Sequence, residues 1–166
     1  MPRVFVTEAV MFAIYGQLLV PEHPVEYIVP YATIQELYDL RESKEPVMQD
    51  EHDETLVREK IAELIGFFEQ SFTKKKIERA LQAPWKKSPP ILINDKVTVS
   101  VVNAYDNVRF GDTFDPIETE LILVSEQEQM PILTDQYEFI EKIVNAEIPV
   151  RVFDIDDFAY ALETEK

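Results

Sequence analysis

Three stretches of the sequence decide the fold: Asp115-Pro116-Ile117-Glu118, Met130-Pro131-Ile132-Leu133-Thr134-Asp135 and Ile148-Pro149-Val150-Arg151-Val152-Phe153. The first is an acidic helix start, and the other two contain short apolar strands separated by a helical segment. Strands that alternate with helices of this length predict a parallel sheet with helices on its faces. Functional residues of such sheets lie beyond the carboxyl ends of the strands, where Thr134 and Asp135 fall.

The rest of the chain repeats this alternation. Apolar runs predict strands at 3–6 and 25–29, and helical spacing predicts helices at 8–14, 33–40, 54–68, 74–81 and 156–162, with a polar loop at 41–53. The helix at 54–68 is expected to bury one face, formed by Leu56, Ile61, Leu64, Ile65 and Phe68. Asn94-Asp95 lies between two apolar runs and predicts a β-hairpin over 91–102. We therefore expect a single α/β domain over residues 1–166, a three-layer α/β/α sandwich with a mainly parallel central sheet.

The composition excludes several classes of protein. The chain of 166 residues has no cysteine, which excludes disulfides and thiolate metal sites and indicates a cytoplasmic location. No apolar run reaches the roughly 20 residues that span a bilayer, so we expect no membrane partner. Only three glycines occur, too few for a Walker phosphate loop or a dinucleotide-binding fingerprint.

The charge of the chain is strongly acidic but unevenly distributed. The net charge is −16, which argues against a surface built generally for nucleic acid. One window is nevertheless +5, with six basic residues and one acidic residue, Glu78. This basic strip consists of Lys74, Lys75, Lys76, Arg79, Lys86 and Lys87. It is a candidate site for RNA, with Trp85 stacking on a base, or else a solvated helix face with Trp85 in the core.

Carboxylates follow several of the predicted strands. They are Glu8, Glu36, Glu118 with Asp115 nearby, and Asp135. Parallel strands would bring them to one edge of the sheet, where a carboxylate cluster suits Mg²⁺ or Mn²⁺. Such an ion can activate water for hydrolysis of a phosphodiester. The alternative is that Glu8 and Glu118 only complement helix N-termini and that Asp135 is an N-cap.

The order of elements, the Glu36-Leu37 pair and the segment 115–153 resemble the PIN-like domain family, most specifically in the final third, where Glu118 lies sixteen residues before Thr134. The resemblance implies an α/β/α sandwich and a metal-dependent ribonuclease in which Glu36 and Glu118 are catalytic carboxylates. The chain departs from the family pattern at two of the four acidic positions. Thr7 stands where the family's first strand ends in an aspartate, with Glu8 following it, and Gln136 stands at the fourth acidic position, with Asp135 preceding it.

These departures favour a binding or regulatory module without catalysis. Its partner would be another protein or a second copy of the chain, bound through Phe67, Phe68 and Phe72 unless these are core residues of an amphipathic helix. The first alternative is the Mg²⁺- or Mn²⁺-dependent ribonuclease. The second is a protein that binds a small phosphorylated ligand at helix N-termini, although the scarcity of glycine counts against it.

Overall fold

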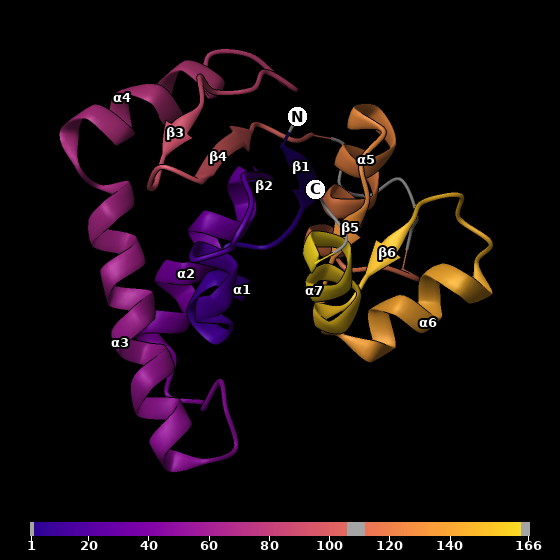
Figure 1. The fold of residues 1–166 in the computed structure, drawn as a ribbon, viewed down its shortest axis with the longest axis horizontal. Coiled ribbons are helices and arrows are strands. Elements are labelled where there is room, and N and C mark those ends of the chain that lie inside the picture. Colours follow the sequence, from indigo (N-terminus) through magenta and orange to yellow (C-terminus); the bar gives the residue numbers. More distant parts are fainter. Residues whose placement is uncertain (1, 106–111, 164–166) are drawn as a thin grey trace.

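The computed structural model describes residues 2–105 and 112–163 and contains one six-stranded sheet with helices on both faces (Figure 1). The strands are β1 (Arg3–Val6), β2 (Val25–Pro30), β3 (Ile91–Leu92), β4 (Val97–Val102), β5 (Ile132–Leu133) and β6 (Val152–Phe153). The helices are α1 (Met11–Ile14), the 3₁₀ helix η1 (Gly16–Leu19), α2 (Tyr31–Glu42), α3 (Glu51–Phe68), α4 (Ser71–Ala80), α5 (Pro116–Glu128), α6 (Tyr137–Asn145) and α7 (Ile155–Glu163).

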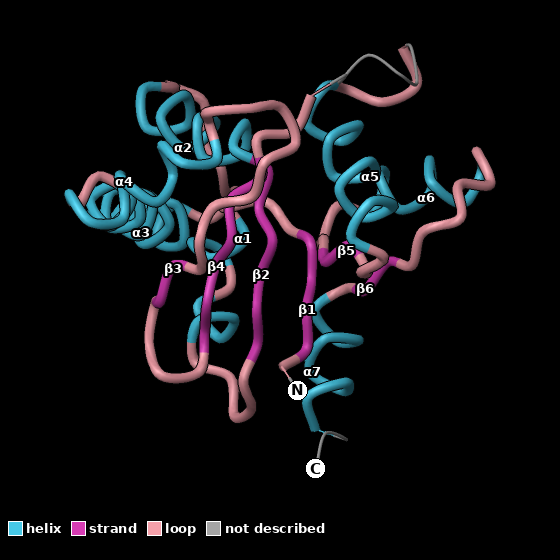
Figure 2. The backbone as a smooth tube through the Cα atoms, turned by 90° about the horizontal axis from the view of Figure 1, so that it is seen from above, coloured by secondary structure: helices cyan, strands magenta, loops and turns pink. Residues whose placement is uncertain are grey.

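The sheet is parallel except at one edge. Its strand order is β3-β4-β2-β1-β5-β6, which Figure 2 shows from left to right. The neighbours are parallel, apart from the antiparallel pair β3–β4. The predicted α/β class with a mainly parallel sheet is thus confirmed, and the predicted hairpin extends the sheet as an edge strand. The carboxyl ends of β1, β2, β4, β5 and β6 consequently meet on one rim.

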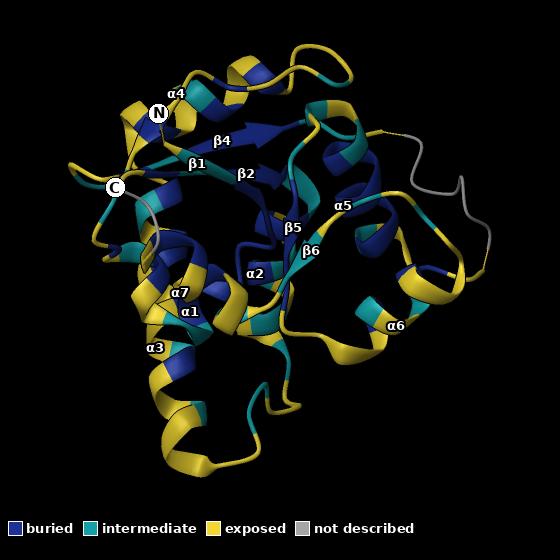
Figure 3. Ribbon diagram, turned by 45° about the vertical axis from the view of Figure 1, so that its right-hand side comes forward, coloured by how far each residue is buried: buried dark blue, intermediate teal, exposed yellow. Residues whose placement is uncertain are grey.

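Two apolar cores fill the space between the sheet and its helices. Successive strand residues point to opposite faces, so Phe5 joins one core and Val6 the other. The first core packs β1, β2 and β4 against α1, α2, α3, α4 and α7, and the second packs the opposite face against α5 and α6. Figure 3 shows the buried strands between these helices. The sheet is therefore covered on both faces, as parallel sheets usually are.

Several predicted boundaries are wrong by a few residues. The helix predicted at 8–14 is only α1, so Glu8 lies in the connection before it, and the loop predicted at 41–53 is shorter because α2 continues to Glu42 and α3 begins at Glu51. The carboxylate of Asp50 caps α3 by accepting hydrogen bonds from the backbone N–H groups of His52 and Asp53. The helix predicted at 74–81 is α4, which begins three residues earlier at Ser71.

Two details of the predicted patterns are also corrected. Leu56 is 47% exposed, and Val57 takes its place on the buried face of α3. The hairpin has no two-residue turn, since β3 ends at Leu92 and the Asn94 carboxamide oxygen accepts hydrogen bonds from the N–H groups of Lys96 and Val97. Within the described residues, no helix is both long enough and apolar enough to span a bilayer.

Candidate functional site

Four carboxylates meet at the carboxyl end of the sheet. We call them the acidic rim: Glu8 after β1, Glu36 in α2, Asp115 at the start of α5 and Asp135 after β5. The charges of the other three all act on the carboxyl group of Glu8. The structure thus brings together Glu8, Glu36 and Asp135 as the sequence predicts, and it adds Asp115.

Hydrogen bonds at the strand ends hold the first two carboxylates side by side. The hydroxyl of Thr33 accepts a hydrogen bond of 3.1 Å from the backbone N–H of Ala9, which ties the residue after Glu8 to the first turn of α2. Because residues three apart share one face of a helix, Glu36 lies one turn above Thr33 and faces Glu8. The hydroxyl of Thr7 donates to the carbonyl of Leu133 over 2.8 Å and fastens β1 to β5.

Glu8 and Glu36 form a hydrogen-bonded carboxyl pair. Burial raises the pKa of Glu8 to about 8, with further contributions from the charges of Glu36, Asp115 and Asp135. Burial and the charge of Asp115 also raise the pKa of Glu36, but its hydrogen bond with Glu8 acts in the opposite direction. Burial and the mutual repulsion of the carboxylates thus favour one proton held between the two carboxyl groups. The Oε1 atom of Glu36 is buried and has no hydrogen-bond partner among the described residues.

The other carboxylates have partners that the sequence analysis did not identify. The side-chain amide of Gln136 donates to Glu8 Oε1 over 3.2 Å, and the hydroxyl of Tyr15 donates to Asp135 Oδ2 over 2.6 Å. No sequence motif marks Tyr15, whereas Gln136 directly follows Asp135 in the sequence.

Glu118 differs from the rim carboxylates. Its backbone N–H donates to Asp115 Oδ1 and its carboxylate accepts from the N–H of Asp115, so the two residues form a capping box. Its carboxylate also pairs with the ammonium group of Lys142 over 2.6 Å. Glu118 therefore helps to begin α5 and is neutralised by a lysine.

The acidic rim as placed does not fit a divalent metal ion. Within residues 2–105 and 112–163, no group of three or more His, Cys, Asp or Glu side chains is arranged so that it could hold a metal. Glu8 retains a proton, Asp135 is held by Tyr15, and Glu118 is held by Lys142. A ligating carboxylate must be deprotonated and free to face the ion. Apart from Glu36 Oε1, which has no partner among the described residues, the predicted ligands are thus held by one another and by their neighbours.

The basic strip is divided between two segments. On α4, Lys74, Lys75 and Arg79 are exposed, while Lys76 donates to the carbonyl of Pro90 over 2.6 Å. The second segment lies along the end of β4, where Lys87 pairs with Glu128 and Lys86 with Gln82. Trp85 is half-buried against the second core. Within the described part of the chain, the cations of the strip that have no ion-pair or hydrogen-bond partner are thus gathered on α4.

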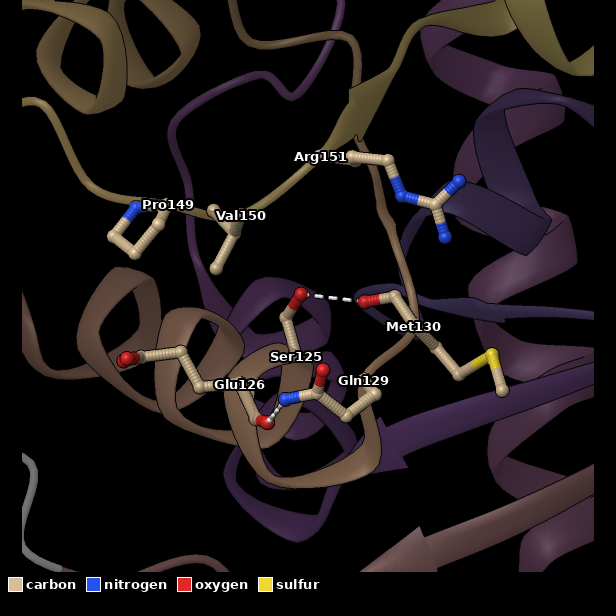
Figure 4. A pocket seen from close by; sticks show the side chains of 7 residues that line it. All are labelled: Ser125, Glu126, Gln129, Met130, Pro149, Val150 and Arg151. Carbon is tan, nitrogen blue, oxygen red and sulfur yellow. Dashed lines mark hydrogen bonds between the residues drawn. The ribbon is translucent and has the colours of Figure 1, made fainter.

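Five pockets among the described residues are lined by no residue of the acidic rim. A polar pocket of about 310 Å³ lies where β5 and β6 begin, at the opposite end of the sheet (Figure 4). It is lined by Ser125, Glu126, Gln129, Met130, Pro149, Val150 and Arg151. None of the predicted site residues lines it.

Comparisons with known proteins identify no relative: no protein-family model matches this chain, and no curated protein matches it significantly.

Proposed function

We propose that this chain is a degenerate PIN-like domain that binds another protein and does not hydrolyse RNA. The observation that carries the proposal is the Glu8–Glu36 carboxyl pair, in which a shared proton compensates for buried charge. A nuclease of this family would need these groups ionised around a metal ion. Gln136 supports the same conclusion, because an amide donor at the family's fourth acidic position satisfies Glu8 without a cation.

One observation favours the alternative, a Mg²⁺- or Mn²⁺-dependent ribonuclease. Glu36 Oε1 is buried without a hydrogen-bond partner among the described residues, and a buried carboxylate oxygen is costly when nothing pairs with it. Convergence of four carboxylates on one rim points in the same direction. A phosphate-binding function has less support, because Asp115 and Glu118 already cap the N-terminus of α5.

Cleavage of labelled single-stranded RNA in Mn²⁺ or Mg²⁺ distinguishes the two functions. The binding module predicts no metal-dependent cleavage by the wild type and no saturable Mn²⁺ binding by calorimetry. Cleavage that requires metal and disappears in Glu36→Gln would contradict the proposal and establish the nuclease. Cleavage that is unchanged by Glu36→Gln would identify a contaminating nuclease, and the proposal would stand.

A further inference from the structure

An apolar pocket of about 190 Å³ opens between the second half of α3, η1 and the β3–β4 hairpin. We call it the α3 pocket. Its lining includes buried Phe12, Leu64 and Phe68 and half-buried Leu19, Phe67 and Ile93. The two charged residues that line it, Lys60 and Glu63, pair with each other over 3.0 Å, and their side chains are 57% and 66% exposed. The pocket therefore presents apolar walls, and its charged groups reach solvent.

The size of the α3 pocket limits what it can hold. A dry cavity of about 150 Å³ accommodates benzene, whereas sites for drug-sized ligands begin at about 300 Å³. The α3 pocket thus fits one aromatic ring or one branched aliphatic side chain. A nucleobase is a poor occupant, because its polar edge would be buried without hydrogen-bond partners.

The charges on the helix that follows α3 define the occupant of the α3 pocket further. Helix α4 begins three residues after Phe68, and its exposed cations Lys74, Lys75 and Arg79 make no ion pair within the described part of the chain. These cations are conspicuous in a chain whose net charge is −16. An acidic partner would be attracted to this face and repelled by most of the remaining surface.

We propose that the α3 pocket and the adjacent cations of α4 bind an acidic peptide segment of a partner protein, which inserts one aromatic or branched aliphatic side chain. The inference rests on the proposed binding function and names the chemistry of its partner. Burial of the inserted side chain supplies affinity, and the cations of α4 select for flanking carboxylates.

Fluorescence anisotropy with a short dye-labelled peptide, glutamates around a central phenylalanine, tests this inference. Replacing the central phenylalanine by alanine should weaken binding by roughly tenfold or more, since full burial of such a side chain is worth about 1.5–3 kcal/mol. Lys74→Glu combined with Lys75→Glu should weaken it by about three- to tenfold, and more at low salt. Lys74→Glu alone should weaken binding to a smaller extent, and its matched control is Lys44→Glu, which makes the same charge change before the other end of α3 and should leave binding nearly unchanged.

Glu63→Trp distinguishes the contribution of the pocket to peptide binding from that of the charges. The substitution places a large ring at the mouth of the pocket and makes the face more positive, and the exposure of Glu63 leaves the core intact. If the pocket holds the anchor, the acidic peptide binds Glu63→Trp at least about tenfold more weakly than the wild type. If charge alone drives binding, the same variant binds it more tightly.

Four results would overturn the inference. The first three are absence of peptide binding, binding that does not depend on the central phenylalanine, and a wild-type dimer that Glu63→Trp dissociates, which would make a second copy the occupant. The fourth is a combination: heparin binds wild type and Glu63→Trp equally, and the peptide binds Glu63→Trp more tightly. This would show a general polyanion-binding surface that does not use the pocket. The RNA cleavage assay on the same preparation tests the proposed function separately, so a failed peptide titration without cleavage contradicts the α3 pocket alone.

Discussion

Glu8 and Glu54 have chemically identical side chains, but their surroundings shift the pKa of the carboxyl group in opposite directions. At the acidic rim, burial and neighbouring carboxylates raise the pKa of Glu8 to about 8. In the first turn of α3, the backbone N–H of Met48 and the guanidinium of Arg58 lower the pKa of Glu54. The loop supplies donors from its own backbone, whereas strand convergence at the rim supplies mostly further acceptors. The fold thus stabilises the carboxylate of Glu54 with hydrogen-bond donors, whereas it favours the protonated form of Glu8.

The largest expected effect is a fall in stability with rising pH, caused by Glu8. Its pKa in the folded state lies above the ordinary 4.5, so the folded protein keeps a proton that the unfolded chain loses. The resulting stability is complete below the unfolded pKa and is lost as pH rises through the folded pKa. Between pH 6 and 8 the free energy of unfolding should fall by about 2 kcal/mol, because each pH unit is worth about 1.4 kcal/mol per proton. Urea unfolding at several pH values measures this.

Glu8→Gln should remove that pH dependence, because its amide cannot ionise. We expect a much shallower profile from pH 6 to 8, to which only the raised pKa of Glu36 still contributes, so that the variant gains up to about 2 kcal/mol on the wild type between these two pH values. The control is Glu59→Gln on the exposed side of α3, which should keep the wild-type slope. An equal slope in Glu8→Gln and wild type would show that Glu8 is ionised in the folded protein. Glu54 does not interfere, because its lowered pKa contributes stability that is lost only as pH falls through acidic values.

Arg58→Met tests how far hydrogen-bond donors stabilise Glu54 and its loop. The guanidinium pairs with Glu54 and donates to the carbonyls of Leu40, Ser43 and Glu45, so it fixes the loop between α2 and α3. We expect a loss of about 1–2 kcal/mol in urea unfolding, moderated because the side chain is 30% exposed. Arg41→Met, which removes an exposed pair with Glu42, should change stability by less than about 0.5 kcal/mol. If the loss in Arg58→Met were as small as that in Arg41→Met, the loop between α2 and α3 would not depend on the Arg58 guanidinium.

The sequence predicted the alternation of elements because apolar periodicity directly reflects which residues face the core. On α3 it placed Ile61, Leu64, Ile65 and Phe68 correctly and misplaced only Leu56. Val57 lies four residues before Ile61 and shares its face, whereas Leu56 is rotated by about 100°. It also missed the start of α3, because the acidic segment around Asp50 was interpreted by composition and not as a cap.

The site was predictable only in part. The rule that strand ends carry function located Glu8, Glu36 and Asp135, since parallel strands end on one rim. The partners of these acids were not predictable, because Tyr15 and Asp135 are 120 residues apart and Gln136 and Glu8 are 128 apart. Such contacts depend on side-chain directions that follow only from the assembled sheet. The ion pair of Lys142 with Glu118 was missed for the same reason.

Lys142→Met tests a third way of stabilising a carboxylate, the ion pair between Lys142 and Glu118. The side chain of Glu118 is only 9% exposed, and removal of its ammonium partner leaves a buried carboxylate with the Asp115 N–H. We expect a loss of about 1 kcal/mol, part of which is the cation's contact with the Phe114 ring, 5.3 Å from its centre. The double variant with Glu118→Gln should recover part of the loss in a double-mutant cycle, because the amide needs no cation. Strictly additive losses would exclude an energetic coupling between the two side chains.

The smallest expected effect is that of Tyr15→Phe, which removes one hydrogen bond and no charge. The Tyr15 hydroxyl donates to Asp135 over 2.6 Å, while burial and this carboxylate raise the pKa of the phenol to about 12. Loss of a hydrogen bond at a partly exposed site should cost about 0.5 kcal/mol at pH 7, because water can replace the donor. Carbon-13 NMR of labelled tyrosine should show one phenol that titrates near 12 in the wild type and is absent from the variant. Because the Tyr15 hydroxyl carries no charge, an effect much larger than this would mean that Asp135 depends on Tyr15 as strongly as Glu54 depends on Arg58.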